Sequence, residues 1–177
     1  MTTLSIIIVN YKSWEHLSIC LDSIQNQKKI NPEIIVLDNN SNDGKIDNYK
    51  SKYNYVKWIE NPKNYGFSRA CNIGALNASG KWILFLNPDT KIPNDCLYIL
   101  LNRVKNINNT IFSIKQIDNK NKDTHAYGIF LNIYSINGIL RFIYRLVFGI
   151  SKRKTSQKPS FSPDWISGSF LLIRQSD

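Results

Sequence analysis

Residues 82–93 read WILFLNPDTKIP, and this stretch decides the fold class. Trp82–Leu86 is an apolar run that fits a strand buried on both faces, as in a parallel sheet. The run ends abruptly at Asn87-Pro88-Asp89, which places an amide, a proline and a carboxylate at the strand tip. Two interpretations are open: a polar turn that caps the helix predicted to begin at Pro93, or a metal and phosphate site at the carboxyl end of a strand.

Two earlier segments repeat the pattern of a buried strand followed by polar residues. Leu4–Val9, LSIIIV, ends at Asn10-Tyr11, and Glu33–Leu37, EIIVL, ends at Asp38-Asn39 and a polar loop. Unbroken β-branched runs of this length are typical of parallel strands. A shorter strand is predicted over Tyr55–Ile59.

Helical spacing of apolar residues follows three of these strands. Three helices are predicted, with Ser13, Ser68 and Pro93 at their starts and Gly80 as the stop of the second. The alternation of strands and helices predicts an α/β fold with a mostly parallel sheet flanked by helices. Such sheets bind ligands beyond the carboxyl ends of their strands, so we expect the polar tips to line one crevice. The predicted inward-facing residues are Trp14, Leu17, Cys20, Leu21, Ile24, Ala70, Ile73, Leu76, Leu97, Leu100, Leu101 and Val104.

Length and charge restrict the possible functions. A chain of 177 residues with 42% hydrophobic residues can form a folded domain with its own core. Residues 1–100 contain 11 Lys/Arg and 9 Asp/Glu, whereas residues 101–177 contain 12 and 4, so the net charge of +10 lies mainly in the second part. This basic part indicates an anionic partner, such as phospholipid, nucleic acid or a phosphorylated substrate.

The signatures of several other classes do not occur. Neither G-x-x-x-x-G-K-[ST] nor G-x-G-x-x-G is present, which argues against a P-loop enzyme and a dinucleotide dehydrogenase. The histidines, His16 and His125, form no H-x-x-x-H pair, which argues against a zinc enzyme. Three cysteines without C-x-x-C spacing indicate reduced thiols, and the N-terminus does not resemble a signal peptide, so we expect a cytoplasmic location.

Four motifs in chain order carry a resemblance to a known family. They are SIIIVNYKSWEHLSICLDSI from Ser5, IIVLDNNSND from Ile34, NPKNYGFSRACNIGALNASGKWILFLNPD from Asn61 and PDWISGSFLLIRQSD from Pro163. Together they resemble the family 2 inverting glycosyltransferases with the GT-A fold, in particular bacterial rhamnosyltransferase-like members. The resemblance extends over nearly the whole chain, and the order of the motifs makes it specific.

The resemblance implies that the strand tips bind a nucleotide diphosphate sugar, UDP- or dTDP-linked. Tyr11 aligns with an aromatic residue that stacks near the base, and Asp38 with a carboxylate that accepts from a ring N–H of uracil or thymine. Asn87-Pro88-Asp89 occupies the D-x-D position, where Asp89 would be a ligand of Mg²⁺ or Mn²⁺. The residues implied in donor binding are Val9, Tyr11, Asp38, Asn39, Asn72, Asn87 and Asp89.

The residues alone also allow structural roles at these positions. Asp38 fits an Asx-turn in DNNSND, Tyr11 fits packing at a strand end, and Asp89 fits a helix-capping turn.

Three features depart from the family pattern. Asn87 replaces the first D-x-D acid, which leaves metal affinity and metal choice open. Cys71 stands where many relatives carry Arg or Asn, so a phosphate contact is lost unless Arg69 supplies it. The family's general base, an Asp or Glu in an E-D motif, would lie beyond Asp177, so we expect this chain to be truncated at its C-terminus and to lack the base.

We divide the chain into a nucleotide-sugar-binding half, 1–107, and an acceptor-side portion, 108–177. In the second portion, strand patterns occur at 112–117 and 165–173, and residues 118–123 fit either a turn or a disordered tip. The resemblance implies that Trp165, Gly168 and Ser169 shape a pocket for a saccharide or lipid-linked acceptor; the start of an ordinary strand is the alternative.

Residues 127–154 form a basic aromatic segment that contains Arg141, Arg145 and Lys152-Arg153-Lys154. The apolar stretches are too short to cross a membrane. An interfacial helix with a basic side would hold the enzyme at the inner face of the cytoplasmic membrane, beside a lipid-linked acceptor. The alternative is a helix that packs under the acceptor-binding half.

Three functions are compatible with the sequence. The first is a glycosyltransferase of cell-surface polysaccharide synthesis, with no nucleic-acid partner expected. The second is a nucleotidyltransferase, which would need a Gly- and Arg-rich loop that NYKSW, from Asn10, does not provide. The third is a non-catalytic basic module that binds a membrane surface or nucleic acid, which leaves the acidic strand tips unexplained.

Overall fold

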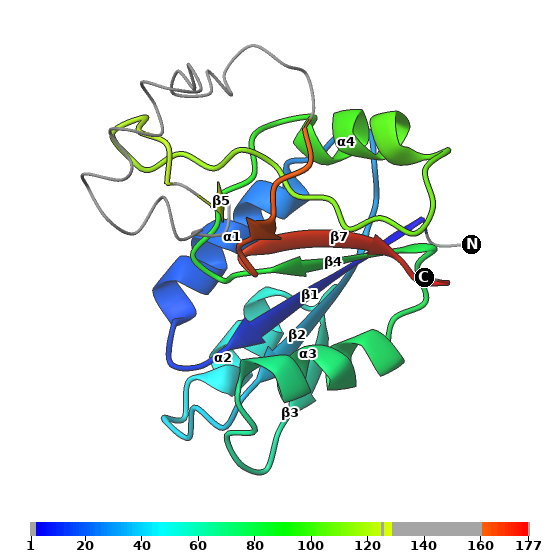
Figure 1. Ribbon diagram of the computed structural model, residues 1–177. Helices are drawn as coiled ribbons and strands as arrows, with labels where there is room; N and C mark the ends of the chain where they lie inside the picture. The colour runs from blue at the N-terminus through cyan, green and yellow to red at the C-terminus, as the bar shows by residue number, and fades with distance from the viewer. Residues whose placement is uncertain (1–2, 125, 129–160, 177) are drawn as a thin grey trace, which may run out of the picture. The chain divides into compact units, whose positions relative to one another are not determined.

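The structure is a computed structural model that describes residues 3–124, 126–128 and 161–176 (Figure 1). It consists of two units. One contains the residues up to Ile114 together with those from Gly168 onward, and the other is Lys115–Ser167. The acceptor-side portion expected over 108–177 is therefore shared between both units.

The first unit is built on a five-stranded sheet with the order β3-β2-β1-β4-β7. Four strands are parallel: β1 (Leu4–Asn10), β2 (Glu33–Asp38), β3 (Lys57–Glu60) and β4 (Trp82–Leu86). β7 (Phe170–Arg174) pairs antiparallel with β4 at the edge. The predicted fold class, α/β with a mostly parallel sheet flanked by helices, is confirmed.

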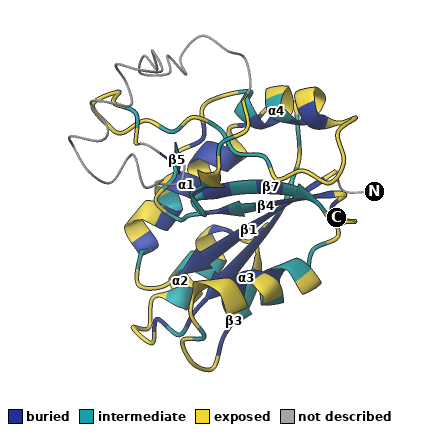
Figure 2. Ribbon diagram, in the orientation of Figure 1, coloured by how far each residue is buried: buried dark blue, intermediate teal, exposed yellow. Residues whose placement is uncertain are grey.

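Helices cover both faces of this sheet, because side chains alternate along each central strand. One core cluster joins alternate residues of β1 to α1 (Trp14–Gln25) and α4 (Cys96–Val104). The other joins the intervening residues of β1 to α3 (Phe67–Leu76). Figure 2 shows β1 and β2 as buried along their length, with exposed residues on the outer sides of the helices. The β1 residues in these clusters are Leu4, Ile6 and Ile8 in the first and Ile7 and Val9 in the second.

The helix boundaries differ from several predictions. Ser13 is at the N-cap of α1 as predicted, but its hydroxyl donates to the carbonyl oxygen of Tyr11 instead of accepting from the helix. Ser68 lies inside α3, which begins after Gly66, where φ is +77°. α4 begins at Cys96, because Pro93 is held in a turn before it.

Gly80 has a different role from the predicted helix stop. α3 already ends at Leu76, and a Cβ at Gly80 would lie 2.5 Å from the backbone nitrogen of Ser5. Glycine is needed here because two backbones approach each other closely.

Two further predictions were incomplete. α2 (Ile46–Lys52) was not predicted; none of its residues is fully buried, and its apolar side, Ile46 and Tyr49, is too short a stripe to reveal a helix. β3 begins two residues later than predicted. The strand expected over 165–173 is divided into β6 (Trp165–Ile166) and β7, and 112–117 forms isolated bridges at Phe112 and Ile117 in place of a strand.

In the second unit, β5 (Tyr127–Gly128) pairs antiparallel with β6. Gly128 packs on the Trp165 indole, where a Cβ would lie 2.5 Å from the ring. The turn predicted over 118–123 is present and closes with a 2.8 Å bond from Asp118 N–H to the Lys122 carbonyl oxygen. Most of the basic aromatic segment, residues 129–154, lies outside the described residues. In the described part of the chain, no helix is long and apolar enough to span a membrane.

Candidate functional site

The register of the sheet brings the polar strand tips to one edge. Asn10, the last residue of β1, pairs with Asp38, the last residue of β2. On the other side of β1, Ile8 pairs with Leu86, so that Asn87 follows at the same edge. Adjacent strands lie about 4.8 Å apart, so the three tips are neighbours. In the sheet, β2 and β3 lie on one side of β1, whereas β4 lies on the other side. The strand order therefore reverses between β1 and β4, and α/β sheets bind ligands at such a reversal.

Asp38 is buried in a local hydrogen-bond network at this edge. Its carboxylate accepts from Asn10 Nδ2 at 3.0 Å, from the backbone N–H of Ser41 at 2.9 Å and from the Ser41 hydroxyl. The Ser41 hydroxyl in turn accepts from the backbone N–H of Lys12 at 2.8 Å. The side chain therefore adopts the Asx-type turn that was the structural alternative, and one carboxylate acceptor position remains beyond these three bonds. The base contact of Asp38 stays a prediction.

Both the amide oxygen and the amide nitrogen of Asn39 form hydrogen bonds within the chain. Its Oδ1 accepts from Asn61 Nδ2 and from the backbone N–H of Tyr65, both at 3.0 Å, and its Nδ2 donates to Asn64 Oδ1 at 2.7 Å. With the side chain 3% exposed, Asn39 fixes the loop between β3 and α3. The contact of Asn39 with the donor stays a prediction.

Exposed side chains project from the same edge. Tyr11 is 47% exposed directly after β1, and Lys12 Nζ lies 5.5 Å from its ring centroid. Asn72 is exposed on α3. Arg69, in the first turn of α3, stacks its guanidinium 4.3 Å from the ring centroid of Tyr65. These residues can reach a ligand, whereas Val9, another predicted donor contact, packs its side chain in the core under α3.

The Asn87-Pro88-Asp89 loop presents a carboxylate at the tip of β4. Asp89 is exposed, and none of the described residues forms a hydrogen bond or an ion pair with its carboxylate. The loop closes through a bond from Thr90 N–H to the Asn87 carbonyl oxygen at 3.2 Å. Cys20 of α1 lies beneath it: burial, and the negative charge of Asp89, raise the pKa of the Cys20 thiol to about 12.

The side chains that the structure describes do not form a metal cage by themselves. The described ranges contain no cluster of three or more His, Cys, Asp or Glu side chains that could hold a metal ion. Asp89 and the Asn87 amide could supply at most three oxygen ligands, and a hard divalent cation takes six or more. Such a donor set fits a cation that is shared with an anionic ligand.

The predicted acceptor residues divide between the two units. The carbonyl oxygen of Ser169 accepts from the backbone N–H of Asn87 at 3.0 Å, so Ser169 is adjacent to the tip of β4. Gly168 lies beside α3, since a Cβ there would be 3.7 Å from the Phe67 ring. Trp165 belongs to the second unit, where it is 42% exposed.

Four residues that organise this edge are not among the predicted donor-binding residues. Asn10, Ser41, Asn61 and Asn64 carry the side-chain bonds that tie together the ends of β1, β2 and β3. Asn10 had a recognisable signal, since it is a polar residue at the end of a buried strand. The other three lie in Asn-rich loops, where nothing in the spacing distinguishes them.

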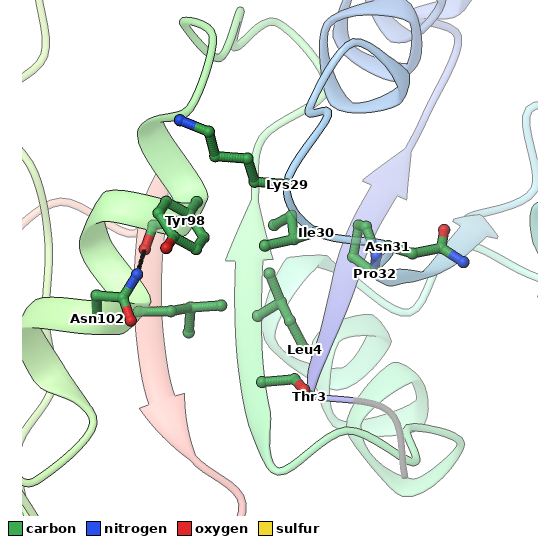
Figure 3. A pocket seen from close by; sticks show the side chains of 9 residues that line it. Thr3, Leu4, Lys29, Ile30, Asn31, Pro32, Tyr98 and Asn102 are labelled. Atoms are coloured by element: carbon green, nitrogen blue, oxygen red, sulfur yellow. Dashed lines mark hydrogen bonds between the residues drawn. The ribbon is translucent and has the colours of Figure 1, made fainter.

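A hollow of about 340 Å³ lies at the opposite edge of the sheet (Figure 3). It is lined by Leu4 at the start of β1, by Lys29 and Ile30 before β2 and by Tyr98 of α4. Lys29 forms an ion pair with Asp95 at 3.1 Å, so its charge is already compensated. The hollow contains none of the predicted site residues and is separate from the strand tips.

Comparison with known proteins gives matches over the same region. Residues 5–173 match the sequence profile described as glycosyl transferase family 2. A cholesterol galactosyltransferase of Borreliella burgdorferi is 32% identical over 110 residues, which cover 60% of this chain and 30% of that protein. A poly(ribitol-phosphate) beta-glucosyltransferase of Bacillus spizizenii is 39% identical over 100 residues, covering 53% and 16%. The rhamnosyltransferase WbbL of Escherichia coli is 28% identical over 123 residues, covering 64% and 45%.

Solved structures share the fold. S. aureus TarS 1–349 in complex with UDP-GlcNAc gives a TM-score of 0.63 at 19% identity, covering 99% of this chain and 46% of that one. The mannosyltransferase PcManGT from Pyrobaculum calidifontis, in complex with GDP-Man and Mn²⁺, gives 0.57 at 20% identity, covering 64% and 35%. The chain spans less than half the length of each of these five proteins.

Proposed function

The chain belongs to glycosyl transferase family 2, and from this premise we propose that it binds a UDP- or dTDP-linked sugar at the strand tips for transfer to a saccharide or lipid-linked acceptor, with inversion. The observation that carries the proposal is the register of the sheet. It aligns Asn10 with Asp38 and places Asn87 and Asp89 beside them, at the reversal of strand order.

The donor would lie across the three tips. Tyr11 offers an exposed ring for stacking on the base, and Asp38 has one acceptor position for a base N–H. Asn72 and Arg69, both exposed on α3, would add contacts to the donor. TarS, a neighbour in fold, is known in complex with UDP-GlcNAc, which supports a uridine donor.

The residues present fit a divalent cation, Mg²⁺ or Mn²⁺, held jointly with the donor diphosphate. Asp89 would provide a carboxylate oxygen and Asn87 an amide oxygen to it. When bound, this cation would offset the charge that builds on the leaving nucleoside diphosphate. The Mn²⁺ in the PcManGT complex supports this assignment.

The acceptor would approach from the start of β7. Ser169 is joined to Asn87 by a backbone hydrogen bond, so an acceptor held at Gly168 and Ser169 would lie beside the donor. For Trp165, in the second unit, an acceptor contact stays a prediction. We assign the general base of inverting transfer to none of the described residues.

The cellular role is proposed from the relatives. A rhamnosyltransferase and a poly(ribitol-phosphate) glucosyltransferase are among the similar proteins, which supports a role in cell-surface polysaccharide synthesis. The basic charge of residues 101–177 supports peripheral contact with the inner face of the cytoplasmic membrane.

Calorimetric titration tests the proposed donor site. UDP and dTDP are titrated into the chain with and without Mn²⁺, with uridine as the ligand that lacks phosphate. We expect Mn²⁺ to strengthen diphosphate binding at least about tenfold and to leave uridine binding unchanged. Binding of any polyanion that depends on salt but not on metal would instead support a non-catalytic basic module.

A further inference from the structure

The side of α1 that faces the core carries polar groups at positions where apolar residues are expected. Cys20, Ser23 and Gln27 follow one another at helical spacing, with Gln27 just beyond the helix end. Their exposed fractions are 1%, 6% and 4%. Buried polar groups on a helix need partners, because an unsatisfied donor or acceptor costs free energy in the interior.

All three side chains contact the backbone of one segment, residues 87–97. Ile92 N–H donates to the Ser23 hydroxyl at 3.0 Å, and that hydroxyl donates to the Cys20 carbonyl oxygen at 2.7 Å. Gln27 Nε2 donates to the Pro93 carbonyl oxygen at 2.9 Å, and Gln27 Oε1 accepts from Leu97 N–H at 3.4 Å. The Cys20 thiol lies 3.9 Å from the Asn87 carbonyl oxygen.

Residues 87–95 connect β4 to α4 without forming a regular element, so these contacts set their path. Inside the segment, only the short turns at Thr90 and Cys96 bond backbone to backbone. The contacts from α1 begin at Asn87 and end at Leu97, and Asp89 lies between them.

We propose that Cys20, Ser23 and Gln27 are positioning residues that hold the 87–97 segment so that Asp89 meets the diphosphate-bound cation. The inference rests on the proposed function. The three side chains contact the backbone of the 87–97 segment, which carries Asp89, and would not contact the donor themselves. Their loss should therefore weaken metal-dependent binding and leave the contact with the base unchanged.

The test compares two buried serines. Ser23→Ala removes the acceptor of Ile92 N–H. Ser5→Ala is the matched control, because Ser5 is also fully buried and also accepts a backbone N–H, that of Gly80 at 2.8 Å, but at the opposite edge of the sheet. The quantity measured is the ratio of the UDP dissociation constants without and with Mn²⁺, together with the uridine dissociation constant.

Ser23→Ala should lower this ratio about fivefold, the effect of about one net hydrogen bond, while uridine binding stays unchanged. Ser5→Ala should leave the ratio unchanged even though both variants are less stable. Gln27→Met keeps the side-chain volume and removes both bonds to the 87–97 segment, together with a 3.3 Å bond to the Ser23 carbonyl oxygen. It should lower the ratio as well. An unchanged ratio in Ser23→Ala, or an equal fall in Ser5→Ala, would overturn the inference.

Amide hydrogen exchange without ligand separates this inference from the proposed function. Exchange over residues 87–97 should be faster in Ser23→Ala than in Ser5→Ala. If the unsubstituted chain binds no nucleoside diphosphate with Mn²⁺, the proposed function fails whatever the exchange shows. If it binds UDP and the two serine variants exchange alike over 87–97, the positioning role fails alone.

Discussion

The backbone N–H of Asn87 donates a 3.0 Å hydrogen bond to the carbonyl oxygen of Ser169. Asn87 follows β4 on the predicted donor side, and Ser169 precedes β7 on the predicted acceptor side. The antiparallel pairing of Leu86 with Phe170 continues directly from this bond. Two segments far apart in the sequence therefore meet through main-chain groups, and side-chain changes at either position leave the junction in place.

Asp89→Asn should remove metal-dependent donor binding without affecting the fold. The carboxylate is exposed, so the free energy of unfolding should change by less than about 0.5 kcal/mol. The affinity for UDP in the presence of Mn²⁺ should fall about tenfold or more, because an amide is a much weaker ligand for a hard cation. Asp47→Asn on α2, an exposed acid that is not among the predicted site residues, is the control, and calorimetry measures both. Retained metal dependence in Asp89→Asn would remove Asp89 from the site.

Asn39→Ala should destabilise the protein and loosen the β3–α3 loop. The substitution leaves the buried Asn61 amide and Tyr65 N–H without their acceptor, at a cost of about 2–3 kcal/mol in the free energy of unfolding. Urea denaturation measures the loss. Asn72→Ala, at an exposed position of α3, should change the free energy of unfolding by less than about 0.5 kcal/mol. Equal stability of the two variants would mean that the network around Asn39 contributes little.

Gly80→Ala should be among the most damaging single substitutions in the chain. The added Cβ would lie 2.5 Å from the Ser5 nitrogen and 2.7 Å from the Leu4 carbonyl carbon, both backbone atoms of β1 that cannot move independently. We expect a loss of about 3 kcal/mol in thermal or urea unfolding. Gly44→Ala is the comparison, because a Cβ at Gly44 would meet no atom but the backbone φ there is +72°. This variant has only the conformational cost, so its free energy of unfolding should fall by about 1 kcal/mol. Similar losses in both variants would contradict the close approach at Gly80.

Glu33→Gln should reduce the pH dependence of stability in acid. Burial raises the pKa of the Glu33 carboxyl, but hydrogen bonds from Ser5 and Ser79 and the charge of Lys57 together lower it below the ordinary value of 4.5. Because the folded-state pKa is lowered, the stabilisation is present above that ordinary value and is lost as the pH falls through the folded-state pKa. The free energies of unfolding of the two proteins should therefore converge as the pH is lowered from about 6 to about 3. A constant difference over this range would show that Glu33 does not titrate with folding.

Strands in the centre of the sheet were predictable from the sequence because each is apolar on both faces. The runs beginning at Leu4, Glu33 and Trp82 each became a strand at almost the expected bounds. Burial on both sides leaves an unbroken apolar signal that needs no knowledge of neighbours. α2 has no buried residue and gave no such signal, so it was missed.

The edge of the sheet was less predictable. The sequence from Trp165 to Ile173 reads as one strand, but its residues separate into β6 and β7 in different units. Gly80 was interpreted as a helix stop, whereas its function is to let β1 approach. Both outcomes depend on contacts with segments that are distant in the chain. The spacing of neighbouring residues carries no information about such contacts.

The sequence by itself determined which residues form the parallel core and that polar side chains follow its strands, since burial and periodicity act over a few neighbouring residues. Only the tertiary structure decided that Asn39 is held by side-chain hydrogen bonds within the chain, that Ser23 and Gln27 bind the backbone beside Asp89, and that Ser169 is adjacent to Asn87. Those outcomes depend on hydrogen bonds between groups brought together by the order and register of the strands. Such hydrogen bonds produce no periodic pattern in the sequence, because their partners are neighbours in space and not in the chain.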